Sequence, residues 1–190
     1  GLISLIHAVI SINLKGDQII SGVAINLFAV ATTSFLIKTL YGVAGTTPQA
    51  PHLANKKLVL IIIYAIAILS HYLLFHTVLG LRIRAVGEHP LAADTVGISV
   101  YKIRYISVIL SGMYAGLGGA YLTAVTLPSF SNNMSAGRGF MAMAAMIFGK
   151  WNPIGAILAS LLFAFGQAFA DVIKASNFPI PQQFLTMIPY

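Results

Sequence analysis

Long runs of apolar residues constrain this chain more than any other feature. A helix needs about 20 mostly apolar residues to cross the hydrocarbon core of a bilayer. Residues 18–40, 56–80, 105–125 and 153–174 each supply such a run, and residues 1–14 have the composition of the end of another. Only 8% of the residues are charged, whereas a soluble domain carries roughly 25%. The sequence therefore predicts an all-α, polytopic bundle of transmembrane helices in a multi-pass membrane protein.

One further apolar run, residues 139–149, is too short to cross. As an α-helix it would extend only about 16 Å, so we expect a broken, tilted or re-entrant helix whose ends are covered by protein or water. The chain begins at Gly1 inside an apolar stretch and stops where residues 182–190 become apolar again. We expect residues 1–190 to be a single transmembrane domain, part of a longer protein and lacking spans at both ends.

The sequence also argues against several function classes. It contains no cysteine, so disulfides and thiolate metal sites are excluded. The patterns G-x-x-x-x-G-K-[ST], H-E-x-x-H and G-x-S-x-G do not occur, and we expect no enzyme activity, catalytic residue, metal ligand or cofactor in this chain. The net charge of +7 comes from basic residues that lie mainly between apolar runs. Basic residues in such connections fix the orientation of the helices in the membrane. We therefore expect membrane lipid, and not nucleic acid, as a partner.

Charge is concentrated in residues 81–104, between two apolar runs. This segment holds Arg82, Arg84, Glu88, Asp94, Lys102 and Arg104. By the positive-inside rule, so basic a short connection lies in the cytoplasm. Alternation then places Lys15 inside and residues 41–55 outside, although Lys56 and Lys57 at the outer end run against the rule. We call residues 81–104 the coupling segment.

The coupling segment contains signals for a short helix. Arg82 and Arg84 are expected in the last turn of the incoming helix, and Gly87 is expected to end that helix in the left-handed cap position. Pro90 is suited to begin a new helix, which Gly97 would end. Its weakly apolar face would consist of Leu91, Ala92, Thr95 and Val96. A helix of about two turns is marginal alone, so the segment is either a simple orienting loop or a knob that fits a groove on a cytoplasmic partner.

Several sequence blocks also carry a resemblance. "RAVGEHPLAADTVGISVYKIR" (84–104) with "SGMYAGLGGAYL" (111–122) resembles the coupling segment and following span of the ABC-importer permeases for branched-chain amino acids, ribose and related sugars, and nucleosides. "GRGFMAMAAMIFGKWNPIGAILASLLFAFGQA" (137–168) resembles a further block of that family. "LKGDQIISGVAINL" (14–27) is similar to its nucleoside-type branch in particular. The resemblance extends from about residue 13 to residue 190.

This resemblance implies a transport subunit without its own motor. A separate P-loop ATPase, which holds ATP and Mg²⁺, would dock on residues 88–97 and drive alternating access. The other implied partners are a second permease subunit, identical or different, and an extracellular or periplasmic solute-binding protein, at a bacterial-type plasma (inner) membrane. A nucleoside is the favoured solute, with a pentose or other simple sugar next. The residues that match the family's coupling loop are Gly87, Glu88, Pro90, Ala92, Ala93, Gly97 and Ile98. With Arg84, His89 and Asp94 of the same segment, they form the predicted ATPase-coupling set.

Small and polar residues recur at helical spacing in the predicted spans. Small residues four apart allow helices to approach closely, and this predicts packing roles for Ser111, Gly112, Ala115, Gly116 and Gly119. Polar residues at membrane depth usually face the bundle interior. Together with an aromatic side chain, which can stack on a ring of the solute, these polar residues predict a substrate path. It includes Asn26, Thr33, Phe140 and Gln167. The alternative for the polar residues is hydrogen bonding between helices without solute contact.

Two other transport-related functions stay open at this point. An ion- or proton-coupled secondary transporter also uses broken helices near the membrane midplane, and it would work without an ATPase. A structural or assembly subunit would have no solute path of its own. Substituting the polar residues of its spans would then leave uptake unchanged.

Overall fold

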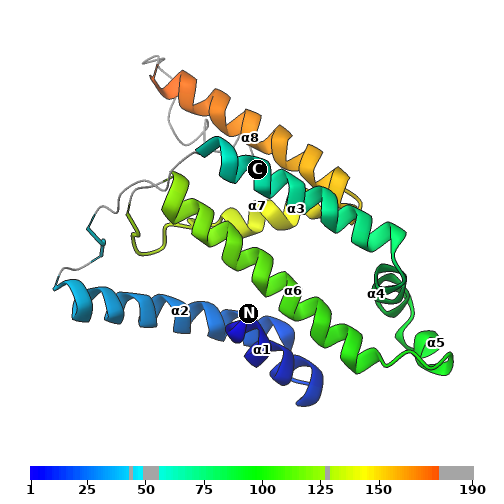
Figure 1. The fold of residues 1–190 in the computed structure, drawn as a ribbon. Coiled ribbons are helices and arrows are strands. Elements are labelled where there is room, and N and C mark those ends of the chain that lie inside the picture. The colour runs from blue at the N-terminus through cyan, green and yellow to red at the C-terminus, as the bar shows by residue number, and fades with distance from the viewer. Residues whose placement is uncertain (43–44, 49–55, 127–128, 176–190) are drawn as a thin grey trace. The chain divides into compact units, whose positions relative to one another are not determined.

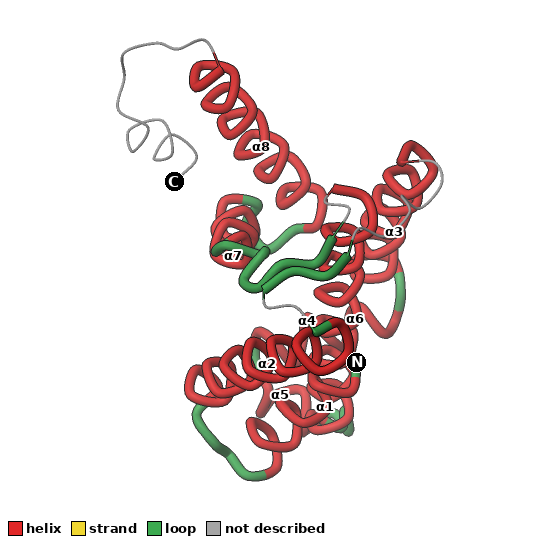
Figure 2. The backbone as a smooth tube through the Cα atoms, turned by 90° about the vertical axis from the view of Figure 1, so that its left-hand side faces the viewer, coloured by secondary structure: helices red, strands yellow, loops and turns green. Residues whose placement is uncertain are grey.

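The computed structural model describes residues 1–42, 45–48, 56–126 and 129–175. Within these ranges the chain is helical and forms no strand, apart from an isolated antiparallel bridge between Thr46 and Ser131. Figure 2 shows helices joined by loops throughout the described part. The predicted all-α class is confirmed. The chain divides into two compact units, unit 1 (1–61 and 73–135) and unit 2 (62–72 and 136–190).

Unit 1 contains most of the helices. They are α1 (Leu2–Ala8), the π-helix η1 (Val9–Asn13), α2 (Gln18–Tyr41), α4 (Val78–Glu88), α5 (Pro90–Thr95), α6 (Val100–Tyr121) and the π-helix η2 (Leu122–Thr126). Both ends of α3 (Lys56–His76) also belong to it. α6 is the central helix of this unit, because α1, α4 and α5 all pack against it, while α1 also contacts α2 (Figure 1).

Unit 2 is built around a helical hairpin. α7 (Arg138–Phe148) packs against α8 (Pro153–Ala175), and the rings of Phe148 and Phe163 meet edge to face with centroids 5.7 Å apart. The connecting turn is tight, since Gly149 and Gly155 are in contact and leave no room for a Cβ atom. The Asn152 Oδ1 accepts a hydrogen bond of 3.0 Å from the Ile154 N–H at the start of α8. The short helix predicted over 139–149 is confirmed as α7.

Four described helices are long and apolar enough to cross a membrane. They are Gln18–Tyr41, Lys57–His76, Val100–Thr126 and Pro153–Ile173. Their side chains are largely exposed on the isolated chain, as expected for helices that face lipid or other helices. The four full spans predicted from the sequence are therefore confirmed, although two of them differ at their ends.

The helix predicted over 56–80 ends earlier. α3 stops at His76, and Thr77 has an extended backbone with φ −119° and ψ 156°. Its hydroxyl accepts a hydrogen bond of 3.2 Å from the Gly80 N–H and so caps α4. The prediction was wrong because an apolar run does not reveal that a threonine within it caps a second helix.

Two boundaries within the coupling segment also differ from the prediction. Gly87 does not end the incoming helix, because α4 continues to Glu88. The end is set by His89, which precedes Pro90 and is held out of the helical region at φ −145° and ψ 84°. At the other side, α6 begins at Val100 rather than at 105. The coupling segment is thus mostly helical.

Candidate functional site

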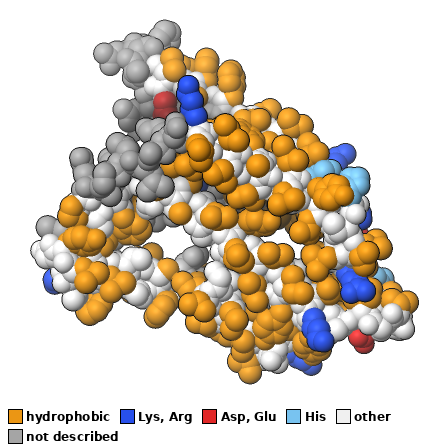
Figure 3. Space-filling model, viewed as in Figure 1, with side chains coloured by type: hydrophobic (Ala, Val, Ile, Leu, Met, Phe, Trp, Pro, Cys, Tyr) orange, Lys and Arg blue, Asp and Glu red, His pale blue; other side chains and the backbone are white. Residues whose placement is uncertain are grey.

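The coupling segment holds more than half of the charged residues of unit 1. It comprises most of α4, all of α5 and the first turns of α6. Figure 3 shows basic and acidic side chains around these helices, while hydrophobic side chains cover most of the same face elsewhere. Charged side chains remain in water or among headgroups rather than in hydrocarbon. This end of unit 1 is therefore the part of it suited to meet a water-soluble partner.

A small apolar core holds the coupling segment together. Val86 of α4, Ala93 of α5 and Ile103 of α6 are 5%, 4% and 7% exposed. Ile83, Ile98 and Val100 are partly buried around them. α5 is too short to be stable alone, and it is held in place because the Ala93 methyl group lies between α4 and α6. Part of the surface that α5 needs for its stability is therefore supplied by α4 and α6 of the same chain.

Backbone hydrogen bonds close both ends of α5. The Ala93 N–H donates to the His89 carbonyl oxygen at 3.1 Å. At the other end, the Gly97 N–H donates to Asp94 at 2.9 Å, and the Ile98 N–H donates to Ala93 at 3.0 Å. Gly97 lies at φ +81°, a conformation that residues with a Cβ rarely adopt. The predicted start of the helix at Pro90 and its termination at Gly97 are both confirmed.

The outward face of α5 exposes two large apolar side chains. Leu91 is 76% exposed and Val96 is 74% exposed, and Ala92 and Thr95 beside them are also exposed. The predicted weakly apolar face therefore points away from unit 1. Exposed charged or polar side chains adjoin it at Glu88, His89 and Asp94. Leu91 and Val96 were not among the residues implied by the resemblance, although the pattern of the apolar face includes both.

Three of the predicted coupling residues face the chain itself. Ala93 is buried in the small core, and Ile98 is half-buried against it. The Arg84 guanidinium lies over the ring of Phe75 with its Cζ 4.7 Å from the centroid. This cation–π contact joins α4 to the end of α3. Ala93 and Ile98 hold α5 in place, and Arg84 holds α4 against α3. Glu88, His89, Ala92 and Asp94 are accessible on α5 or directly before it.

Behind the coupling segment, unit 1 contains a cavity of about 540 Å³. Gly87 and Pro90 line one side of it, and His7, Gln18 and Arg104 line the others. The His7 Nδ1 lies 2.9 Å from the Ser21 Oγ, in a hydrogen bond that joins α1 to α2. A displacement of α4 and α5 would change the wall of this cavity, so the coupling segment is physically continuous with α1 and α2.

The predicted path residues are divided between the two units. Asn26 and Thr33 lie on α2 in unit 1, while Phe140 and Gln167 lie on α7 and α8 in unit 2. Asn26, Phe140 and Gln167 are exposed. The Thr33 hydroxyl donates to the carbonyl oxygens of its own helix, at 2.7 Å to Ala29 and 3.1 Å to Val30. Thr33 can therefore offer another group only its acceptor lone pairs and its methyl group.

One of the predicted packing residues lies at a helix crossing within unit 1. A Cβ atom at Gly112 would overlap the side chain of Ser4 on α1, so α1 and α6 approach closely there. Gly116 and Gly119 have no atoms of the described chain within 4 Å of a Cβ position. Ser111 and Ala115 are likewise exposed on α6.

Comparison with known proteins identifies relatives over the whole chain. A guanosine ABC transporter permease protein of Bacillus subtilis, NupQ, is 42% identical over 212 residues, which cover 100% of this chain and 66% of the relative. A nucleoside ABC transporter permease protein of Lactococcus lactis, NupC, is 43% identical over 211 residues, again 100% of this chain and 66% of the relative. A second nucleoside ABC transporter permease protein of Lactococcus lactis, NupB, is 35% identical over 121 residues, 63% of this chain and 33% of the relative.

The chain thus spans just under two thirds of the length of the first two relatives. No solved structure is significantly similar to it. The family described as the permease component of the branched-chain amino acid transport system matches residues 1–188. This match and the four apolar helices confirm the predicted multi-pass localisation in a plasma (inner) membrane. The chain belongs to this family of ABC transporter permease components, and the relatives that match its whole length are nucleoside-type permeases.

Proposed function

We propose that the chain forms part of the transmembrane permease subunit of an ATP-driven importer for nucleosides. ATP and Mg²⁺ are held by a separate P-loop ATPase, which docks on residues 88–97 on the cytoplasmic side. The observation that carries the coupling role is the outward face of α5, where Leu91 and Val96 are exposed on a helix that is itself fixed to α4 and α6. The family membership and the nucleoside-type relatives support the transport class and the substrate class.

In this proposal, α5 acts as a rigid knob. A groove on the ATPase takes up Leu91 and Val96, and Glu88 and Asp94 select basic groups at its rim. Because Ala93 locks α5 to α4 and α6, a movement of the knob is passed to two helices at once. ATP binding and the opening of the solute path are then linked by a coupling free energy, typically about 1–3 kcal/mol.

The coupling role is tested with the full-length permease and its ATPase. Leu91→Ser should release the ATPase during affinity purification and lower uptake, because it removes an apolar anchor from the interface. Leu81→Ser is the matched control, since Leu81 is a leucine of α4 that is also exposed. Glu88→Ala and Gly97→Val should likewise lower uptake while membrane insertion stays intact. ATPase retention and uptake at wild-type levels in Leu91→Ser and Glu88→Ala would contradict the docking role.

The same preparation separates ATP-driven transport from ion-coupled transport. We expect a P-loop ATPase at fixed stoichiometry, and uptake in proteoliposomes that requires ATP and Mg²⁺. Uptake by the permease alone, driven by an ion gradient, would instead support a secondary transporter.

Two further partners are part of the proposal. Lactococcus lactis has both a NupC and a NupB permease protein, and both are similar to this chain. This supports pairing with a second, different permease subunit around the path. An extracellular or periplasmic solute-binding protein would deliver the solute from the opposite side. Cross-linking in native membranes followed by mass spectrometry tests both associations.

The substrate assignment is tested by substituting the predicted path residues. A nucleoside offers an aromatic base and several hydrogen-bonding groups, which match exposed amide side chains and an exposed aromatic ring. Asn26, Gln167 and Phe140, the last 71% exposed, supply these groups. Asn26→Ala should lower guanosine uptake or change the preference between purine and pyrimidine nucleosides, measured with radiolabelled solutes. Unchanged rates and preferences would remove Asn26 from the path.

A further inference from the structure

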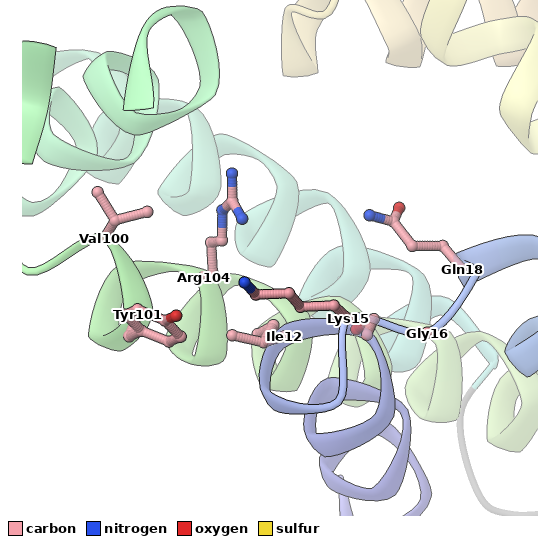
Figure 4. A pocket seen from close by; sticks show the side chains of 8 residues that line it. Ile12, Lys15, Gly16, Gln18, Val100, Tyr101 and Arg104 are labelled. Atoms are coloured by element: carbon pink, nitrogen blue, oxygen red, sulfur yellow. The ribbon is translucent and has the colours of Figure 1, made fainter. Parts of the chain in front are cut away.

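A second, smaller cavity of about 320 Å³ lies in unit 1 beside the coupling segment (Figure 4). Lys15 and Gly16 line it from the turn between η1 and α2, and Gln18 lines it from the first residue of α2. Tyr101 and Arg104 line it from the first turns of α6. Figure 4 shows that the side chains of Lys15 and Arg104 extend toward the same space. Two cationic groups from distant parts of the sequence therefore meet at one cavity.

No carboxylate lines this cavity. The nearest acidic residue in the sequence, Asp17, caps α2, where its Oδ1 accepts hydrogen bonds from the Ile19 N–H at 2.7 Å and the Ile20 N–H at 3.2 Å. Within the described ranges, neither Lys15 nor Arg104 forms an ion pair. Like charges directed at one space repel each other. The electrostatic balance of the cavity therefore favours an anion.

The two walls of the cavity are fixed to each other. The Tyr105 hydroxyl donates a hydrogen bond of 2.9 Å to the Asn13 Oδ1, and this joins α6 to the end of η1. The Gly16 N–H donates to the Ile10 carbonyl oxygen at 3.0 Å, which folds the turn back onto η1. Lys15 itself lies at φ +51°, an unfavourable conformation for a residue with a Cβ. The surrounding contacts thus hold Lys15 in a defined position, as in a preorganised binding site.

The chemistry of the lining residues selects one class of anion. An arginine guanidinium matches the oxygens of a phosphate group in a two-pronged hydrogen bond, and a lysine adds a point charge. Gln18 adds an amide donor at the cavity edge. The cavity lies at the ends of α2 and α6, both long enough to span a membrane. Lipid headgroups occupy this depth, and basic pockets between membrane helices on the cytoplasmic side bind anionic headgroups.

We propose that this cavity binds the phosphate group of an anionic phospholipid headgroup. Arg104 and Lys15 hold the phosphate, and the lipid tails lie along the apolar surfaces of α2 and α6. Arg104 also lines the larger cavity that reaches Gly87 and Pro90. A bound headgroup therefore braces the joint between the coupling segment and α2, so the composition of the bilayer affects the subunit at its coupling end.

Native mass spectrometry of the full-length permease tests this site directly. The protein is presented with mixed micelles that contain equal amounts of phosphatidylglycerol and phosphatidylcholine. We expect the wild-type protein to retain phosphatidylglycerol preferentially. Each basic group near the membrane contributes about fivefold to anionic lipid affinity, so Lys15→Ala with Arg104→Ala should weaken retention by about 25-fold. Lys102→Ala is the matched control, because Lys102 is an exposed basic residue of the same helix that does not line the cavity.

A second arm separates a lipid headgroup from free phosphate. Inorganic phosphate is added to the same micelles, and retained phosphatidylglycerol should persist because its tails add affinity that phosphate lacks. Retention that is equal in the wild type and the double variant would overturn the site. Binding of inorganic phosphate without preference between the two lipids would overturn the lipid assignment. The measurement needs neither ATPase nor nucleoside, so its outcome is independent of the proposed transport function.

Discussion

The small core beneath α5 makes a quantitative prediction about the coupling segment. Val86 is 5% exposed and contacts the core shared with Ala93 and Ile103. Val86→Ala removes two methyl groups, each of which contributes about 0.8 kcal/mol by transfer from water. With the cost of the remaining cavity, the loss reaches about 2 kcal/mol. Because α5 has six residues and few other anchors, most of this loss should appear as local opening of α5.

Hydrogen exchange of the full-length protein in nanodiscs measures that opening. A loss of about 2 kcal/mol corresponds to roughly 30-fold faster exchange. The effect should fall on the amides of Gly97 and Ile98, whose hydrogen bonds close α5, while the middle of α6 stays protected. Val78→Ala is the control, since Val78 is 66% exposed on the same α4 helix. Equal exchange of the α5 peptide in wild type and Val86→Ala would refute the anchoring of α5 by this core.

Three further predictions concern single contacts. Tyr105→Phe removes a hydrogen bond to η1 and should lower the free energy of unfolding by about 1 kcal/mol, measured as a shift in thermal midpoint. Tyr101→Phe removes no hydrogen bond described in the structure and should shift the midpoint less. Gly112→Ala overfills the crossing of α1 and α6 and should cost about 1–3 kcal/mol, and adding Ser4→Gly should restore the midpoint; no restoration would contradict this close approach. Pro90→Ala loosens the first turn of α5 and should raise its exchange by about twofold to fivefold, while unchanged exchange would show that the proline contributes nothing to local order.

The transmembrane helices were predictable because their length and composition are set by the bilayer itself. α2 and α8 begin within one residue of their predicted starts, where Asp17 and Pro153 give local signals for a helix N-terminus. The break at Thr77 was missed because a threonine in an apolar run fits a continuous helix equally well. The end of α4 at Glu88 could have been predicted from Pro90, since the residue before a proline avoids the helical region.

The candidate site was predictable in outline and not in its orientation. The sequence patterns located the short helix and its two ends, because Pro90 and Gly97 act through local backbone chemistry. Which side of α5 faces inward depends on Val86 and Ile103, which approach Ala93 only after the chain has folded. The basic cavity was not predicted for the same reason, since Lys15 and Arg104 are far apart in the sequence.

The residues that hold α5 and the residues that it presents are different sets. Ala93 and Ile98 face inward, whereas Leu91 and Val96 face outward. Substitutions on the outward side therefore leave the stability of the segment almost untouched, and selection can act on them independently of the fold. Duplicated permeases that share one scaffold can in this way diverge toward different ATPases through a few surface changes, and exchanging those side chains between two such permeases should exchange their motors.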